Sequence, residues 1–260
     1  MRCGDIISKL EELSPESYAL SWDNVGLLIG RRDKEVNKVC IALDATSEVI
    51  EQAVKMNADM ILTHHPLIFK GTKKICQDDY VGKRIIKLIQ NDICLVAMHT
   101  NFDVMGMADA AADELNLKGR EVLEITSNEE GVHEGLGRYG RLPHIMTLRE
   151  CAEYVKEVFK LPQVVVYGDL LQDVERMAVL PGSGRDEVAL AKEVGADVYL
   201  TGDISHHAGI DAVEMGINVI DAGHFGIEQI FVPYMKDFFI REMRSVVVEM
   251  AKQEIPFSII

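Results

Sequence analysis

Short apolar runs alternate with amphipathic stretches along most of this 260-residue chain. Apolar residues recur at helical spacing in residues 5–13, 47–56, 80–89, 107–115, 147–159, 186–194 and 227–243. Apolar runs that predict strands lie between or beside them, at residues 26–30, 36–43, 60–62, 93–97, 164–167, 176–180, 217–220, 246–248 and 257–260. This alternation predicts an α/β fold with mainly parallel sheets covered by helices.

Residues 121–141 interrupt this alternation, and we expect them to be irregular. They contain Gly135-Leu136-Gly137-Arg138-Tyr139-Gly140, which matches the GxGxxG pattern of dinucleotide-binding proteins. That motif requires a strand directly before it and a helix opening from it, and the sequence predicts neither here. We therefore exclude a dinucleotide site and expect the glycines to allow a bend or a close approach of two backbones.

The second half of the chain repeats a pattern found in the first half. Residues 193–203 follow the order of residues 55–65: the end of a helix, Ala-Asp, an apolar strand and a threonine. The strand at 217–220 and the histidine after it likewise match the strand at 93–97 and its following histidine. We expect two related α/β lobes, residues 1–125 and 126–260, with the segment from about residue 221 returning to complete a composite metal site between them.

The composition excludes several classes of protein. The chain has 48% hydrophobic residues, enough for a sizeable core, and a formal net charge of −15, which opposes binding to a nucleic-acid backbone. Its five cysteines are odd in number and form no CxxC pair, as in reduced cytosolic proteins. The sequence shows neither a signal-peptide pattern nor an apolar run long enough for a membrane span, so we expect a soluble cytoplasmic protein.

Histidines and carboxylates follow three of the predicted strands, at the point where each strand ends. They are His64 and His65 after the strand at 60–62, His99 and Asp103 after the strand at 93–97, and His224 and Glu228 after the strand at 217–220. Ligands of open α/β sheets bind just outside the carboxyl ends of the strands. Imidazole and carboxylate ligands together suit Zn²⁺, Fe²⁺ or Mn²⁺, so the pattern indicates a metal site.

The number of these candidate ligands exceeds what one catalytic ion needs, and it suits two ions bridged by a carboxylate and a water. Another histidine pair, His206-His207, follows the duplicated strand and is a candidate for lining the same cavity. His133 and His144 lie in connecting sequence, and we treat them as ordinary surface residues.

Several other residues are candidates for contact with a substrate. Asp23 and Asp44 lie beside predicted strand ends, and Pro181-Gly182-Ser183-Gly184 leads into the helix at 186–194. A glycine turn before a helix can hold an anion, so Ser183 and Gly184 either contact a substrate phosphate or form an ordinary strand-to-helix turn. Trp22, the only tryptophan, is expected to anchor the core.

Taken together, these motifs resemble the NGG-interacting-factor-three-like family, whose members are often labelled GTP cyclohydrolase type-2-like or dinuclear metal centre proteins. The residues that carry the resemblance are Ser21-Trp22-Asp23-Asn24-Val25-Gly26-Leu27, Thr63-His64-His65-Pro66-Leu67, His99-Thr100-Asn101-Phe102-Asp103, Gly135-Leu136-Gly137-Arg138, Thr201-Gly202-Asp203 with His206-His207, and Asp221-Ala222-Gly223-His224 with Glu228. The resemblance runs from near residue 1 to near residue 260.

The resemblance implies a specific metal centre and assembly. Its metal ligands would be His64, His65, Asp103, His224 and Glu228, with Asp103 as the bridge between two divalent ions. It also implies a homohexamer built as a trimer of dimers, with metal sites facing an interior cavity. Some longer members carry an inserted middle domain, and this chain resembles the short form without it.

Two functions from different classes follow from these expectations. The first is a dinuclear metal-dependent hydrolase acting on a nucleotide-like or phosphoester substrate, with His99, His206 or His207 as general acid or base. The second is a non-enzymatic hexamer that holds metals or binds a partner, in regulation or metal trafficking. An open coordination position would favour the enzyme, because structural metal sites are closed. DNA binding is a third option, which the −15 charge disfavours.

Overall fold

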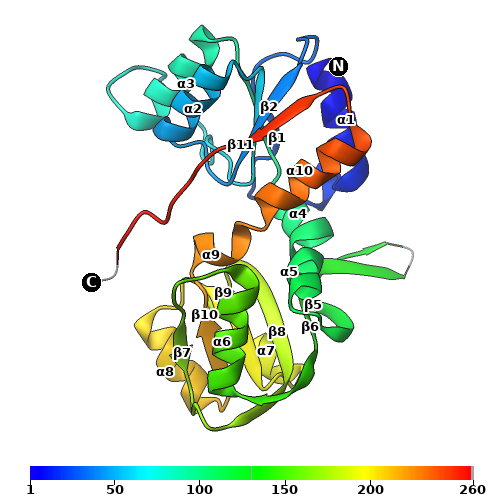
Figure 1. Cartoon of the computed structure of the whole chain (residues 1–260), viewed down its shortest axis with the longest axis vertical. Helices are drawn as coiled ribbons and strands as arrows, with labels where there is room; N and C mark the ends of the chain where they lie inside the picture. The colour runs from blue at the N-terminus through cyan, green and yellow to red at the C-terminus, as the bar shows by residue number, and fades with distance from the viewer. Residues whose placement is uncertain (130, 259–260) are drawn as a thin grey trace. The chain divides into compact units, whose positions relative to one another are not determined.

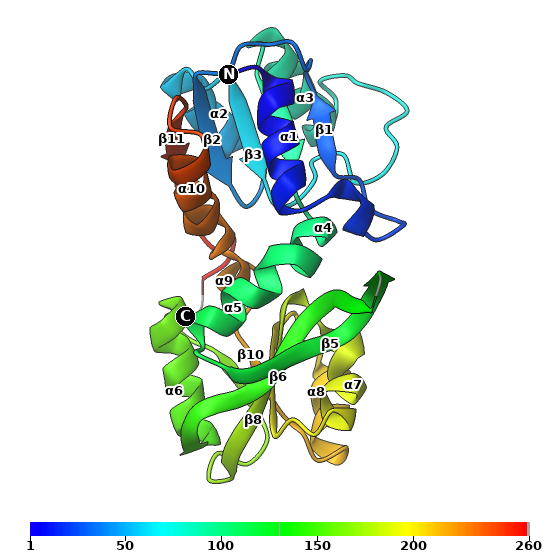
Figure 2. The same ribbon diagram turned by 90° about the vertical axis from the view of Figure 1, so that its right-hand side faces the viewer.

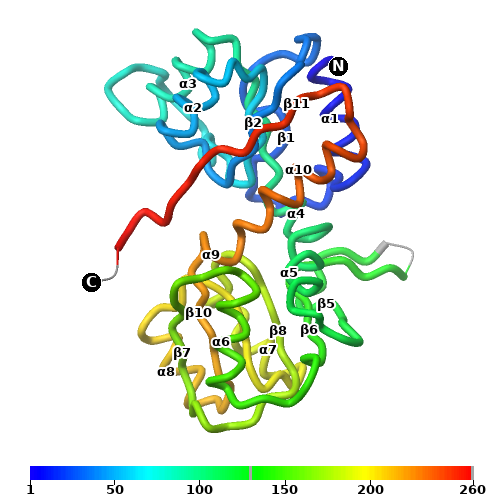
Figure 3. The backbone as a smooth tube through the Cα atoms, viewed as in Figure 1, coloured from blue at the N-terminus to red at the C-terminus, as the bar shows by residue number. Residues whose placement is uncertain are grey.

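The computed structural model describes residues 1–129 and 131–258, and no helix in this part of the chain is long and apolar enough to cross a membrane. The chain forms two compact units, Met1–Phe102 with Phe231–Ile260, and Asp103–Ile230. These boundaries differ from the predicted division near residue 125. The C-terminal segment returns to the first unit, where its strand joins the sheet, as the chain trace in Figure 3 shows.

The first unit is built around a five-stranded sheet with the order β1-β4-β3-β2-β11. Its strands are β1 (Gly26–Ile29), β2 (Lys38–Ala42), β3 (Met60–Thr63), β4 (Cys94–Ala97) and β11 (Val247–Met250). Its helices are α1 (Cys3–Leu13), η1 (Glu16–Tyr18), α2 (Ser47–Met56), α3 (Tyr80–Gln90), α4 (Thr100–Phe102) and α10 (Phe231–Glu242). Neighbouring strands are parallel except β1, which pairs antiparallel with β4.

Helices cover both faces of this sheet, α2 and α3 on one and α1 and α10 on the other (Figure 1). Side chains from α2 and α3, among them Ile50 and Leu88, pack with alternate strand residues such as Cys40, Ile61 and Leu95 into one core. This burial on both faces explains why the parallel strands read as unbroken apolar runs in the sequence.

The second unit contains a six-stranded mixed sheet with the order β5-β6-β8-β9-β10-β7. Its strands are β5 (Lys118–Glu129), β6 (Val132–Thr147), β7 (Val165–Tyr167), β8 (Asp173–Ser183), β9 (Val198–Gly202) and β10 (Asn218–Asp221). Its helices are η2 (Asp103–Met107), α5 (Ala108–Glu114), α6 (Leu148–Phe159), η3 (Arg185–Glu187), α7 (Val188–Glu193), α8 (His206–Glu214) and α9 (His224–Glu228). Residues of α5, α6 and α9 pack on one face, and those of α7 and α8 pack on the other (Figure 2).

The two units share the strand arrangement that the sequence repeat predicted. Sheet order β1-β4-β3-β2 in the first unit matches β7-β10-β9-β8 in the second, and β1 and β7 are each antiparallel to their neighbour. The aspartate of the repeated Ala-Asp pair has the same structural role in both units. Asp59 accepts the backbone N–H groups of Asn37 and Lys38 at 2.8 and 3.0 Å, and Asp197 accepts those of Glu175 and Arg176 at 2.9 and 2.8 Å.

Residues 121–129 and 132–141 are regular, contrary to the sequence prediction, because they lie in a long antiparallel ribbon of β5 and β6. Many of its residues are charged or glycine, which hides the strand signal. The glycines do permit a close approach, as predicted. A Cβ on Gly135 would lie 1.8 Å from the carbonyl oxygen of Glu124 on the paired strand.

The C-terminal third departs from prediction at two places. The single helix expected at 227–243 is divided into α9 and α10, which begins two residues before Pro233. Proline has no N–H and its ring crowds the carbonyl four residues earlier, so it is accepted in a first turn but not in a helix interior. The strand predicted at 246–248 is present as β11. Residues 251–258 form no strand, and residues 259–260 lie outside the described part.

Gly135→Ala is expected to destabilise the protein by about 2 kcal/mol, since the added methyl group must push two paired backbones apart. Gly71→Ala is the matched control, because a Cβ there meets no atom within 4 Å. Urea unfolding followed by circular dichroism measures both free energies. Equal stability of the two variants would contradict the β5–β6 register described above.

Candidate metal centre

Three histidines cluster at one edge of the first sheet. His64 and His65 follow β3, and His99 follows β4, so the parallel pairing of Thr63 with Ala97 brings them to the same edge. One ring nitrogen from each lies within 4.8 Å of the others, and the ring centroids are 4.9 to 5.5 Å apart. His64 is fully buried. Three imidazole nitrogens this close are donors that could hold a divalent transition ion.

The Nδ1 atoms of His64 and His65 are each fixed by a hydrogen-bond acceptor. His64 donates to the carbonyl oxygen of Met98 at 2.7 Å, and His65 donates to the Asp44 carboxylate at 2.9 Å. An imidazole that donates from Nδ1 carries its lone pair on Nε2 when neutral. Metal-binding histidines usually have their second nitrogen held this way, by a carbonyl or a carboxylate.

His99 is held in the same way by Asp23. Its Nδ1 lies 2.9 Å from the Asp23 carboxylate, which also accepts the backbone N–H of Thr100 at 3.0 Å and its hydroxyl at 2.5 Å. Burial tends to raise the pKa of Asp23, but the hydrogen bonds from His99 and Thr100 outweigh it and lower that pKa to about 2. Asp23 is therefore ionised at neutral pH and can only accept, which makes His99 Nδ1 the donor and Nε2 the basic nitrogen.

The second unit carries another imidazole–carboxylate pair, on α9. His224 and Glu228 are one helical turn apart, with Nε2 and Oε2 separated by 3.1 Å, and Glu228 is buried. Nδ1 of His224 lies 2.9 Å from the Asp203 carboxylate. Gly182 leaves room for the Glu228 carboxylate, because a Cβ at that position would lie 2.6 Å from Oε1 of Glu228. His224 therefore resembles the histidines of the first unit: its Nδ1 is held by an acceptor, and its Nε2 lies beside another potential ligand atom, Oε2 of Glu228.

Asp103 is half-buried and is the first residue of the π-helical turn Asp103–Met107. A π-helical turn is rare and is often found at functional sites. The donors described so far are imidazole nitrogens and carboxylate oxygens, and each imidazole is anchored through Nδ1. This donor set fits a divalent transition ion such as zinc, iron or manganese.

The remaining histidines lie apart from these groups. His206 and His207 occupy the exposed first turn of α8, with their rings 5.4 Å apart, and His133 and His144 are exposed on β6. Among the described residues, none of these four belongs to a cluster of three potential ligands. The catalytic role predicted for His206 and His207 stays a prediction without a supporting contact.

The residues predicted to contact a substrate make hydrogen bonds within the protein instead, except Ser183, which is exposed. Asp23 has a fully buried side chain and orients His99, while the partly exposed Asp44 orients His65. Ser183 is exposed at the end of β8, but the Gly184 N–H donates to the Thr201 hydroxyl at 3.0 Å, so that amide is already used. Substrate contact by these residues stays a prediction, and the geometry favours an ordinary turn at Ser183 and Gly184.

Sequence reasoning was wrong about Trp22 and missed Asp203. Trp22 is 55% exposed and does not anchor the core. Asp203 orients His224, and the internal repeat offered a signal for it, because Asp203 occupies the position that matches His65. The carbonyl of Met98 was also missed, and no pattern of side chains could reveal a backbone acceptor.

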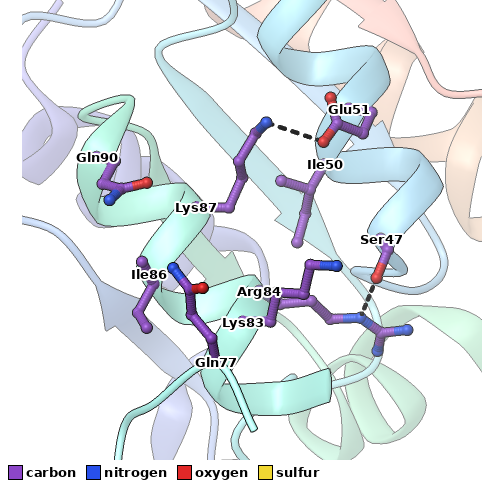
Figure 4. Close-up of a pocket in the computed structure, with 9 residues that line it drawn as sticks. All are labelled: Ser47, Ile50, Glu51, Gln77, Lys83, Arg84, Ile86, Lys87 and Gln90. Carbon is purple, nitrogen blue, oxygen red and sulfur yellow. Dashed lines mark hydrogen bonds and ion pairs between the residues drawn. The ribbon is translucent and has the colours of Figure 1, made fainter. Parts of the chain in front are cut away.

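A cavity of about 170 Å³ opens elsewhere in the first unit, between α2 and α3 (Figure 4). Its basic residues include Arg84, which donates to the Ser47 hydroxyl at 3.1 Å, and Lys87, which pairs with Glu51 at 2.9 Å. The cavity contains no imidazole and two of its cations are already paired, so we do not assign the metal chemistry to it.

Known proteins share this chain's sequence and fold. The family model described as Duf34/NIF3 (NGG1p interacting factor 3) matches residues 1–256. A Clostridium acetobutylicum protein named "GTP cyclohydrolase 1 type 2 homolog" is 40% identical over 88% of this chain and 85% of its own length. A Bacillus subtilis protein of the same name is 29% identical over 92% of this chain and 91% of its own. The crystal structure of a Bacillus cereus protein related to NIF3 superposes with a TM-score of 0.93 at 28% identity, covering 100% of this chain and 99% of that one.

The Bacillus subtilis alignment extends over 345 positions, more than the 260 residues of this chain, so that relative carries a long insertion. This chain lacks the insertion, as the resemblance to the short form predicted. Since the family model covers nearly all of its residues and a relative shares 40% of the aligned positions, the chain belongs to the DUF34/NIF3 (NGG1p interacting factor 3) family.

Proposed function

We propose that this protein is a dinuclear metal-dependent hydrolase that acts on a nucleotide-like or phosphoester substrate. The supporting observation is the convergence of His64, His65 and His99, each fixed through Nδ1, at the carboxyl edge of a parallel sheet. We assign the ligands of two ions to His64, His65, Asp103, His224 and Glu228, which requires both units of the chain to contribute.

Two bound ions would polarise a substrate oxygen and lower the pKa of a water molecule. The protein supplies the proton transfer, and we assign it to His99. Nε2 of His99 can accept a proton, because Nδ1 is held by ionised Asp23, and the same carboxylate then stabilises the imidazolium. Five protein ligands do not fill the coordination of two ions, and open positions favour chemistry over a purely structural site.

The names of the relatives support the substrate class without fixing the reaction. Both the Clostridium acetobutylicum and the Bacillus subtilis proteins are called homologues of a GTP cyclohydrolase, which suggests a nucleotide, but family membership does not determine the chemistry. We also propose a homohexamer arranged as a trimer of dimers, which the family resemblance implies.

The second candidate is a metal-holding or partner-binding assembly without enzymatic activity. The family description favours it, because NGG1p interacting factor 3 is named for a protein partner. Turnover separates the two candidates: an enzyme releases product in proportion to time, whereas a metal carrier gives up only its bound ions.

Reconstituted protein is expected to bind about two divalent ions per chain, because the five assigned ligands exceed what one ion needs. Elemental analysis of protein purified without added metal, and again after anaerobic loading and removal of excess ions, gives this ratio. Saturation at one ion per chain would rule out the dinuclear assignment.

Asp103→Ala should lose both ions, whereas His133→Ala should lose neither. Asp103 is the assigned bridge, and without its charge the two cations repel each other. His133 is an exposed residue on β6 and serves as the control. Metal content and native mass measured together show whether the assembly survives the loss of metal. Full occupancy in Asp103→Ala would show that the bridge is misassigned.

His99→Gln is expected to lower kcat by about 100-fold while the metal content stays near the wild-type value, because His99 transfers protons and is not among the assigned ligands. Hydrolysis of GTP and of a simple phosphoester by metal-loaded protein provides the assay. If the loaded wild-type protein turns over neither class of substrate, the hydrolase proposal fails and the metal-holding alternative stands.

A further inference from the structure

Two large aromatic side chains are exposed beside the histidine cluster. Trp22 is 55% exposed and Phe69 is 46% exposed, and their ring centroids are 5.7 Å apart. The rings are inclined by 54°, so neither covers the face of the other. A single exposed apolar residue is ordinary, but an exposed tryptophan paired with a phenylalanine is the kind of surface that takes part in binding.

Both aromatic rings lie against His99. The centroid of Trp22 is 6.0 Å from that of His99, and the centroid of Phe69 is 6.4 Å from it, both edge to face. His99 in turn lies 5.2 and 5.5 Å from His64 and His65. The aromatic pair therefore borders the residues to which we assign the chemistry.

The backbone holds this pair in place from two loops. Asn24, two residues after Trp22, donates from its side-chain amide to the carbonyl oxygen of Ile68 at 2.5 Å, which ties the two loops together. Asp23, which lies between Trp22 and Asn24 in the sequence, accepts hydrogen bonds from His99 and Thr100. A pair that is already in position loses little conformational entropy when a ligand binds.

Three lysines follow Phe69 in the same loop. Lys70, Lys73 and Lys74 are exposed, in a chain whose net charge is −15. Aromatic side chains stack on the face of a planar ring, and cations nearby meet phosphate groups. Aromatic and cationic side chains in one loop suit a ligand that carries both a heteroaromatic ring and phosphate.

We propose that Trp22 and Phe69 form a platform for the planar base of a nucleotide, which stacks on one ring and meets the edge of the other, next to the lysines of the loop that follows Phe69. This inference rests on the proposed function and makes it more specific, since it selects a nucleotide over a simple phosphoester. Trp22 and Phe69 are positioning residues that hold the base, while His99 and the assigned metal ligands face the reacting group.

The sequence supplies a direct probe of this platform, because Trp22 is the only tryptophan in the chain. Its fluorescence is recorded in metal-loaded protein during titration with GMP and, separately, with ribose 5-phosphate, which has the phosphate without the base. GMP is expected to quench the emission saturably, and ribose 5-phosphate is expected to leave it unchanged. Excitation at the red edge of the tryptophan absorption keeps absorption by the purine low.

Phe69→Ala should weaken GMP binding on the order of tenfold or more, since stacking on one aromatic ring contributes about 1–3 kcal/mol per base. Phe257→Ala is the matched control, because Phe257 is 61% exposed and makes no ring contact among the described residues. Circular dichroism verifies that both variants are folded. Equal GMP affinity in the two variants would overturn the platform.

The outcomes separate this inference from the proposed function. Saturable quenching by GMP, together with no hydrolysis of GTP or of the simple phosphoester, supports the platform and rules out the proposed hydrolase activity. Hydrolysis of GTP with unchanged Trp22 emission overturns the platform and leaves the hydrolase standing. Emission that acrylamide cannot quench in the free protein would show that a second copy of the chain covers Trp22, and would also overturn the platform.

Discussion

Hydrogen bonds donated by the Nδ1 atoms of four histidines are the constraint that fixes the geometry of the candidate metal centre. Each acceptor comes from the same unit as the imidazole it holds: Met98, Asp44 and Asp23 in the first unit and Asp203 in the second. Each bond fixes the ring orientation and leaves Nε2 as the nitrogen with the lone pair. Because these contacts lie within each unit, folding of that unit is enough to orient its own histidines.

The duplicated architecture explains why candidate site residues follow corresponding strands in the two units. In both units a carboxylate at the start of a strand, Asp59 or Asp197, binds two backbone N–H groups of the neighbouring parallel strand and sets its register. The register decides which strand ends lie side by side, and these ends are followed by His64 and His65 in the first unit and by Asp203 in the second. A slip by one residue would turn every strand side chain to the opposite face.

The loops around β1, β3 and β4 of the first unit carry three kinds of side chain suited to binding a ligand. Buried His64 and partly buried His99 supply imidazole nitrogens, Trp22 and Phe69 supply open aromatic rings, and the loop after Phe69 supplies positive charge. Each has a cost in an isolated domain: clustered imidazoles repel when protonated, exposed aromatic rings contact water, and lysines close together in one loop repel one another. A ligand with metal affinity, a planar ring and phosphate would remove all three costs at once.

Local patterns in the sequence determined the α/β class, the internal repeat and the position of the histidines, because periodicity and strand ends are written in neighbouring residues. They also marked Asp103, His224 and Glu228 as candidates. The β5–β6 ribbon, the break before α10 and the exposure of Trp22 depended on tertiary structure. Pairing between distant strands, crowding by Pro233 and burial are set by residues far apart in the chain or by packing. Likewise, only the folded backbone brings the Met98 carbonyl to His64, since every residue has a carbonyl and the sequence cannot say which one accepts.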